Sequence, residues 1–173
     1  MKTLYIARHA KSSWRNTSLI DIDRPLKSSG VMMAYKVAKR LIEAEVNLDA
    51  IYSSPAIRAM HTAIIYARTL EFPENRVEIR PSLYNKGKEG IYELVKQVNE
   101  DYNSIMITGH DPTLTHFVNE YMAVPLEKLQ TSGIIQLDLE TDKWTHIRQA
   151  NPIRIVYFKR EETRELKYAK QNY

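Results

Sequence analysis

Arginine and histidine side chains follow apolar runs at three places in this sequence. Arg8 and His9 come directly after the run LYIA, and His110 follows the run SIMIT by one glycine. Arg58 comes shortly after the third run, AIYSS. Arginine donates planar, bidentate hydrogen bonds to phosphate oxygens. Two arginines and two histidines brought to one place would form a pocket for a tetrahedral dianion, so the sequence predicts a phosphate-binding site.

Each of these residues has an ordinary structural interpretation when it is taken alone. Arg8 could be a surface charge at the end of a strand, and His110 could cap a helix or pack against it. Arg58 is more informative because it falls in the first turn of a predicted helix. A cation there opposes the helix dipole and costs about 0.3 kcal/mol or more unless an anion binds. Taken together, the three places favour the functional interpretation.

A bound phosphoryl group needs a nucleophile or an activated water. The chain has no cysteine, which excludes a thiol nucleophile, a disulfide and a thiolate metal site. The histidines are too scattered along the sequence for a metal site. His9 therefore remains as the candidate nucleophile, because a neutral imidazole can attack at neutral pH.

Apolar runs that resemble buried strands alternate with segments of helical period. This alternation predicts an α/β fold, with a mostly parallel sheet between two layers of helices and a late antiparallel hairpin. The predicted strands are Thr3–Ala7, Ala50–Ser53, Val77–Ile79, Ser104–Thr108, Gly133–Leu139 and Lys143–Gln149. The predicted helices are Ser28–Glu45, Ala56–Leu70, Lys88–Asn99 and Pro112–Met122. Ligands of such sheets bind beyond the carboxyl ends of the strands, where the arginines and histidines lie.

The 173 residues, 43% hydrophobic and 27% charged, suit one domain over residues 1–158. We expect the charged segment 159–173 to be a solvated, partly frayed tail. The stretch 11–27 has no clear period, and long irregular loops are often functional. The net charge is +4, and the Lys and Arg residues are interspersed with Asp and Glu rather than clustered. This pattern favours a small or protein-borne anion over nucleic acid as the ligand. No run is apolar enough for a membrane span, and we expect a cytoplasmic protein.

Four segments of the chain resemble the histidine phosphatase superfamily, in particular its SixA-like phosphohistidine phosphatase branch. They are RHAKSSW, DIDRPLKSSG, SSPAIRAMHTA and GHDPTL, in that order. The resemblance implies a phosphoglycerate mutase-like fold and a metal-independent phosphatase with no cofactor. It implies that His9 forms a phosphohistidine intermediate, while Arg8, Arg58 and His110 hold the phosphoryl oxygens. The implied substrate is a phosphohistidine-bearing protein or a small phosphorylated molecule.

The sequence departs from many relatives at the position of the proton donor. Those relatives carry Leu-x-Glu after the third strand, whereas this chain reads Leu83-Tyr84-Asn85. A phosphoramidate can leave as a neutral imidazole and needs less protonation than an alkoxide, so Asn85 favours phosphohistidine over a sugar phosphate. Other carboxylates remain open as donors, namely Asp23, Asp111 and Glu89.

Two further cations are candidates for phosphate binding. Lys11 stands where mutase-like relatives have Glu, and it either attracts an acidic substrate or is an ordinary solvated lysine. Arg24 either closes on the phosphate or pairs with Asp21 or Asp23 inside the loop, and the structural role is slightly favoured. Two alternatives stay open for the whole protein: a small-molecule phosphomonoesterase or mutase, and a non-catalytic module that binds a phosphorylated ligand.

Overall fold

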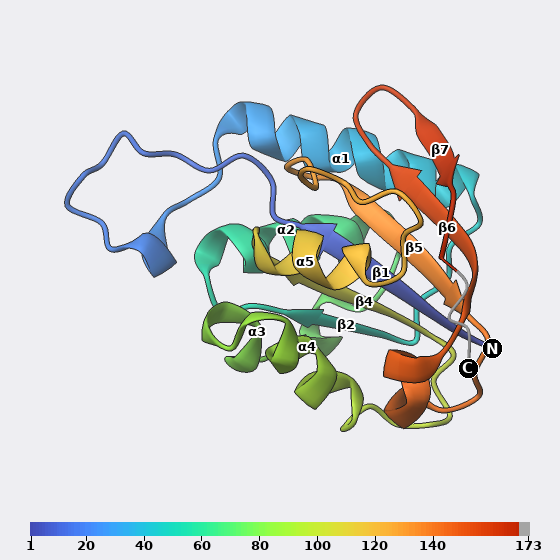
Figure 1. Ribbon diagram of the computed structural model, residues 1–173. Helices are drawn as coiled ribbons and strands as arrows, with labels where there is room; N and C mark the ends of the chain where they lie inside the picture. Colours follow the sequence, from blue (N-terminus) through green and yellow to red (C-terminus); the bar gives the residue numbers. More distant parts are fainter. Residues whose placement is uncertain (170–173) are drawn as a thin grey trace.

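Seven strands form a single mixed sheet in the order β3-β2-β4-β1-β5-β6-β7. The strands of this computed structural model, which describes residues 1–169, are β1 Lys2–Arg8, β2 Ala50–Ser53, β3 Val77–Ile79, β4 Ser104–Gly109, β5 Ile134–Leu139, β6 Pro152–Phe158 and β7 Thr163–Leu166. Strands β3, β2, β4 and β1 are parallel to one another, whereas β5, β6 and β7 each run antiparallel to the preceding strand of the sheet. The parallel half therefore brings the carboxyl ends of β1, β2 and β4 to one edge (Figure 1).

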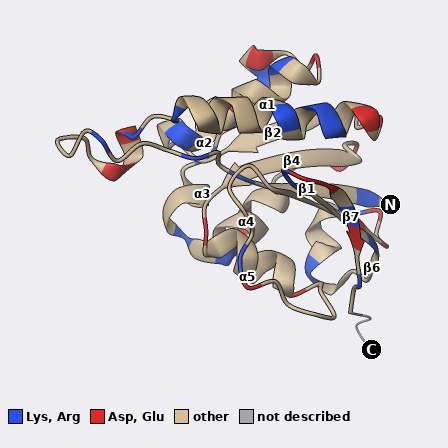
Figure 2. Ribbon diagram, turned by 90° about the horizontal axis from the view of Figure 1, so that it is seen from above, with Lys and Arg blue, Asp and Glu red and all other residues tan. Residues whose placement is uncertain are grey.

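Helices cover both faces of the sheet and complete the predicted three layers. The α-helices are α1 Ser28–Glu43, α2 Ile57–Thr69, α3 Ser82–Asn85, α4 Gly87–Val95 and α5 Thr113–Asn119. Short 3₁₀ turns occur at η1 Asp21–Asp23, η2 Glu74–Arg76 and η3 Trp144–Gln149. Helices α1 and α2 lie on one face, and α3, α4 and α5 lie on the other (Figure 2). No helix in the described part of the chain is long and apolar enough to cross a bilayer.

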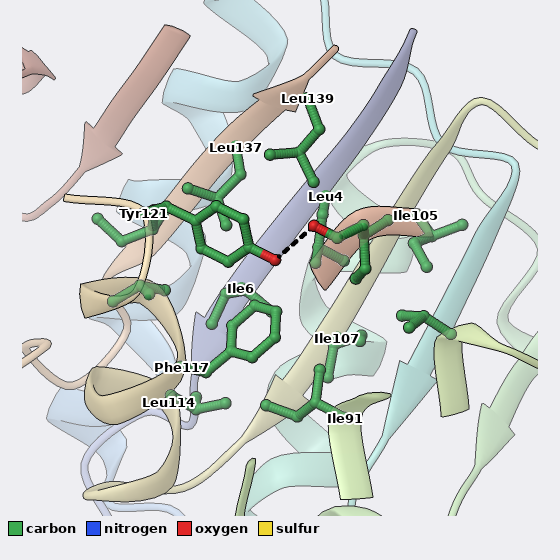
Figure 3. Close-up of a cluster of buried hydrophobic side chains, with 14 of the residues drawn as sticks. Leu4, Ile6, Ile91, Ile105, Ile107, Leu114, Phe117, Tyr121, Leu137 and Leu139 are labelled. Atoms are coloured by element: carbon green, nitrogen blue, oxygen red, sulfur yellow. Dashed lines mark hydrogen bonds between the residues drawn. The ribbon is translucent and has the colours of Figure 1, made fainter. Parts of the chain in front are cut away.

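Alternating side chains of β1 enter the two cores, as the two-residue period of a strand requires. Leu4 and Ile6 pack with α4 and α5, whereas Tyr5 and Ala7 pack against α1 and α2. The first core is closed by Tyr121, whose hydroxyl donates to the main-chain oxygen of Ile147 at 3.0 Å (Figure 3). A strand that is buried on both faces is held rigidly, so the residues at its end are well positioned.

The prediction that Lys143–Gln149 forms the second strand of the late hairpin is wrong. This segment is η3, and the strand that pairs with β5 is β6, a few residues later. The buried side chains of η3 are Trp144 and Ile147, and a spacing of three places both on one side of a 3₁₀ turn. The Trp144 indole N–H donates to the oxygen of Tyr102 at 2.8 Å, which anchors the turn against the loop before β4.

The charged segment after residue 158 is not only a solvated tail. Thr163–Leu166 forms β7, which pairs with β6, and Tyr168 forms an isolated bridge with Met122. The side chains of β7 are mostly exposed, so its polar sequence is compatible with an edge strand that is held by main-chain hydrogen bonds. The end of the predicted tail, residues 170–173, lies outside the described residues.

The segment 11–27 is the long irregular loop that the sequence predicts. It projects beyond the sandwich in both views (Figures 1 and 2). An isolated bridge between Ser12 and Leu26 closes its base, and η1 forms one turn near its end. Gly30 in α1 lies against the main chain of Lys11, where an added Cβ would overlap the Lys11 oxygen. The loop is therefore fixed where it leaves and rejoins the domain.

Candidate active site

The carboxyl ends of three parallel strands bring the predicted residues together. β1 ends in Arg8 and is followed by His9, β4 is followed by His110, and the turn after β2 leads into α2 and Arg58. The His9 N–H donates to the oxygen of Gly109 at 3.0 Å, which joins the ends of β1 and β4 directly. The cleft at this edge has a volume of about 350 Å³. Its lining includes all six candidate residues from the sequence, Arg8, His9, Lys11, Arg24, Arg58 and His110.

One ring nitrogen of His9 is occupied by the main chain. Nδ1 lies 2.8 Å from the oxygen of Ala10, and because a carbonyl only accepts, Nδ1 carries the proton in this contact. Nε2 then carries the lone pair that a nucleophile needs. Burial is the main cause that lowers the pKa of His9 to about 4; the Ala10 contact opposes this shift, and the charges of Arg58 and Arg8 contribute to it. His9 is thus neutral at physiological pH.

The second histidine faces the first across the cleft. The ring centroids of His9 and His110 are 5.1 Å apart, and His110 Nε2 lies 2.7 Å from the hydroxyl of Ser54. Burial, and then the neighbouring His9 and Arg58, lower the pKa of His110 to about 3. His110 Nδ1 is buried and has no hydrogen-bond partner among the described residues. A neutral His110 can therefore contribute a hydrogen bond to a ligand rather than a full charge.

Arg8 is held by the segment after α5 and by the start of that helix. Its Nη1 donates to the oxygen of Leu129 at 2.6 Å and lies 3.3 Å from a carboxylate oxygen of Asp111. Its Nε is buried without a hydrogen-bond partner in the described part of the chain. A buried N–H that lacks a partner is costly, so Arg8 is held with one donor unsatisfied. Asp111 does not cap α5, because its other oxygen accepts from the Thr115 hydroxyl at 2.7 Å.

Arg58 is held by Asp21, a residue of the 11–27 loop. Arg58 Nη1 donates to the main-chain oxygen of Asp21 at 2.5 Å, and Nη2 donates to its carboxylate at 2.7 Å. A guanidinium has five N–H bonds, so Arg58 keeps further donors for a ligand. The same carboxylate accepts from Arg24 at 2.7 Å and from the Tyr84 hydroxyl at 2.9 Å. Although partial burial opposes the shift, these hydrogen bonds lower the pKa of Asp21 to about 2.

The contacts of Arg24 fit the structural role, in which it pairs with Asp21 inside the loop. Besides Asp21, Arg24 donates to the Ser12 hydroxyl at 2.6 Å and to the oxygen of Ser13 at 3.2 Å. Its guanidinium carbon lies 3.2 Å from the centroid of the Trp14 ring. Arg24 therefore ties both ends of the loop together while it lines the cleft. Lys11 is exposed and also lines the cleft.

The proton-donor candidates differ in position. Asp111 lines the cleft, whereas Glu89 pairs with Arg148 on the outer side of α4 and Asp23 is exposed in η1. Glu89 and Asp23 do not belong to the cleft lining. Within residues 1–169, no group of three or more His, Cys, Asp or Glu side chains is arranged to hold a metal ion.

Tyr84 and Ser54 were not predicted as site residues from the sequence, and Asp21 was expected only as a partner of Arg24. Tyr84 lies edge-on to His110, with 5.5 Å between ring centroids. It directly precedes Asn85 at the position where relatives carry their acid, and this adjacency was the one available signal. The contact between Asp21 and Arg58 spans 37 residues, and no local pattern predicts it.

Comparisons with known proteins agree with this geometry. Residues 4–85 match the family described as the histidine phosphatase superfamily, branch 1. An uncharacterized chloroplastic protein of Arabidopsis thaliana is 34% identical over 118 residues, which are 64% of this chain and 54% of that protein. This chain therefore spans about half the length of that relative.

Two solved structures share the fold. One is assigned as the phosphohistidine phosphatase SixA of Agrobacterium tumefaciens, with 25% identity, a TM-score of 0.72 and coverage of 89% of this chain and 96% of that chain. The other is the protein histidine phosphatase SixA complexed with tungstate, with 24% identity, a TM-score of 0.70 and coverage of 79% of this chain and 88% of that chain. The motifs, the family match over residues 4–85 and this shared fold lead to one conclusion: the chain has a SixA-like fold and is similar to the histidine phosphatase superfamily.

Proposed function

We propose that this protein is a phosphatase that removes a phosphoryl group from phosphohistidine through a covalent intermediate on His9. The observation that carries the proposal is the tautomer of His9. Its Nδ1 is tied to Ala10, so the Nε2 lone pair is available in a cleft with two arginines and a second histidine. In the first step the Nε2–P bond forms while the bond from phosphorus to the leaving nitrogen breaks, and the electron pair of that bond stays on the nitrogen. The substrate ring enters with its other nitrogen protonated, so it leaves as a neutral imidazole. Water then attacks phosphorus, releases phosphate and restores neutral His9.

The arginines and His110 stabilise this reaction electrostatically. Phosphoryl transfer depends mainly on positioning and on neutralising the charge of the equatorial oxygens. Arg8 and Arg58 supply cationic donors from two different elements, β1 and α2. His110 contributes a neutral hydrogen bond because the pKa of its imidazole is about 3. We infer from their place in the cleft that Arg24 and Lys11 add positive potential at its mouth.

The choice of phosphohistidine depends on the leaving group. Asn85 cannot donate a proton as the Glu of other superfamily members does, and a phosphoramidate leaves as neutral imidazole with little help. The names of both SixA structures support the same substrate class. Asp111 is the carboxylate that lines the cleft, and it is the candidate acid for an ester substrate.

Two measurements test the proposal. The first compares the parent with His9→Ala on para-nitrophenyl phosphate, and equal rates would refute the nucleophile. Rapid quenching without acid should trap phosphate on His9 of the parent, and the absence of both turnover and a trapped adduct would favour a binding module. The rate should be unchanged by a chelator, because the attack on phosphorus uses no metal ion.

The second measurement is a panel of phosphoramidates against alkyl phosphate esters. We expect kcat/KM for phosphohistidine peptides to exceed that for alkyl esters by at least about 100-fold, the usual scale of general-acid catalysis. Equal values would favour the phosphomonoesterase or mutase alternative. The cytoplasmic location stays a prediction, and the related Arabidopsis protein is described as chloroplastic.

A further inference from the structure

Trp14 is a large aromatic side chain at the cleft for which the chemistry above gives no role. It is 69% exposed, whereas the other tryptophan of the chain, Trp144, is fully buried. Trp14 nevertheless belongs to the lining of the cleft that contains His9 and Arg58. Burial of an indole ring would stabilise the fold, and Trp14 does not gain this stabilisation because it is exposed. A functional reason for its position at the cleft is therefore worth seeking.

The Trp14 ring is held on one face and open on the other. The Arg24 guanidinium covers one face, 3.2 Å from the ring centroid. Arg24 is itself buried and fixed by hydrogen bonds to Ser12, Ser13 and Asp21. The exposure of Trp14 shows that the rest of the ring is uncovered. The loop therefore presents a pre-organised aromatic surface at the rim of the cleft.

The position of this surface fits the leaving group. When Arg8, Arg58 and His110 hold a phosphoryl group, in-line attack by His9 directs the leaving group away from His9 and out of the cleft. A planar ring that leaves in this direction can stack on an aromatic side chain at the rim, with rings in offset or edge-to-face contact. An alkyl leaving group has no face with which to make this contact.

We propose that Trp14 is a specificity-determining residue that stacks on a planar aromatic leaving group bound to phosphorus. The chemical class includes an imidazole with a P–N bond and an aryl group with a P–O bond. This inference rests on the proposed function for its reaction, but the stacking contact itself is a property of binding. It can therefore be measured on ligands that are not hydrolysed.

The first test measures the dissociation constants of phenylphosphonate and methylphosphonate, which share the anionic head and differ in the ring. Trp14→Ala and Trp14→Leu should weaken phenylphosphonate by about 3- to 10-fold, the scale of an aromatic pair. Methylphosphonate should change by less than about 2-fold, since it lacks the ring. Trp14→Phe should restore most of the difference, because it keeps an aromatic face. Phenylphosphonate should also quench the fluorescence of the parent but not that of Trp14→Phe, since Trp144 is buried.

The outcomes separate stacking from a structural role. Trp14→Leu keeps an apolar cover over Arg24, so equal weakening of both phosphonates by Trp14→Ala alone would show that Trp14 only holds Arg24. No change for either ligand would also overturn the proposal. Ile20→Ala is the matched control, because Ile20 is 65% exposed on the same loop and lies outside the cleft lining. It should leave both dissociation constants unchanged.

Turnover measurements distinguish the two kinds of leaving group, imidazole and aryl. Trp14→Ala should reduce kcat/KM for a phosphohistidine peptide and for phenyl phosphate, but not for phosphoramidate itself. A loss confined to phenyl phosphate would assign the surface to aryl esters, and a loss confined to the peptide would assign it to imidazole. If the protein turns over none of these compounds while the phosphonate pattern holds, the proposed function fails and the stacking surface stands.

Discussion

Asp21→Asn is the substitution that tests how the loop positions the arginines. The carboxylate accepts from Arg58, Arg24 and Tyr84, and both arginines are buried. An amide keeps one acceptor oxygen, so at least one of these donors loses its partner and faces an N–H instead. Arg58 and Arg24 donate to different oxygens of this carboxylate, so the amide disrupts the contact with one of the two arginines. We expect the loop that positions Arg58 to lose its fixed place, which would impair transition-state binding more than folding.

The size of the effect follows from the pKa of Asp21. The displacement of this pKa from 3.8 to about 2 corresponds to roughly 2 to 3 kcal/mol if it is fully expressed. The side chain is 47% exposed, so solvent screening reduces the contribution to stability to about 1 kcal/mol. Because the pKa is lowered on folding, this stabilisation is present above pH 3.8 and is lost as the pH falls towards about 2. For catalysis we expect kcat/KM to fall by about 10- to 100-fold, or about 1.4 to 2.7 kcal/mol.

The assay combines steady-state kinetics on phosphoramidate with urea denaturation at pH 7. Asp23→Asn is the matched control, because Asp23 lies in the same turn and its exposed carboxylate makes no hydrogen bond or ion pair in the described part of the chain. Equal kinetics and stability in the two variants would refute the positioning role. A lower KM in Asp21→Asn would also refute it, because it would show that the carboxylate competes with phosphate for Arg58.

Two more predictions concern the histidines and the base of the loop. In a proton NMR titration His9 should stay neutral until the pH nears 4. Because the pKa of His9 is lowered on folding, the free energy of unfolding should decline as the pH falls from about 6.5 towards 4. A titration midpoint near 6.5 would contradict the burial argument. Gly30→Ala should lower the free energy of unfolding by about 1 to 3 kcal/mol, because the new Cβ overlaps the main chain of Lys11. A main chain, unlike a side chain, cannot avoid the overlap by changing its rotamer. Urea denaturation measures this loss, and Ser29→Ala on the exposed side of the same helix should stay within about 0.5 kcal/mol of the parent; equal stability of the two variants would contradict the close approach.

The parallel half of the sheet and the helices around it were predictable because their patterns are local. The run TLYIA contains alternating side chains for two cores, and a strand of this kind is recognisable from its own residues. Segment 143–149 was mistaken for a strand because Trp and Ile also favour strands. Only its contacts with the loop before β4 select a 3₁₀ turn. Strand β7 was missed because its pairing depends on the main chain of β6 rather than on apolar side chains.

By itself, the sequence determined which residues gather at the cleft. Arg8, His9, Arg58 and His110 follow strands that end at one edge, so the composition of the site was readable from residue order and strand pattern. The tertiary structure decided how those residues are held. The tautomer of His9, the lowered pKa values and the bond from Asp21 to Arg58 depend on burial and on contacts across tens of residues. The exposure of Trp14 and its contact with Arg24 also depend on the tertiary structure, because the fold determines which side chains cover a ring.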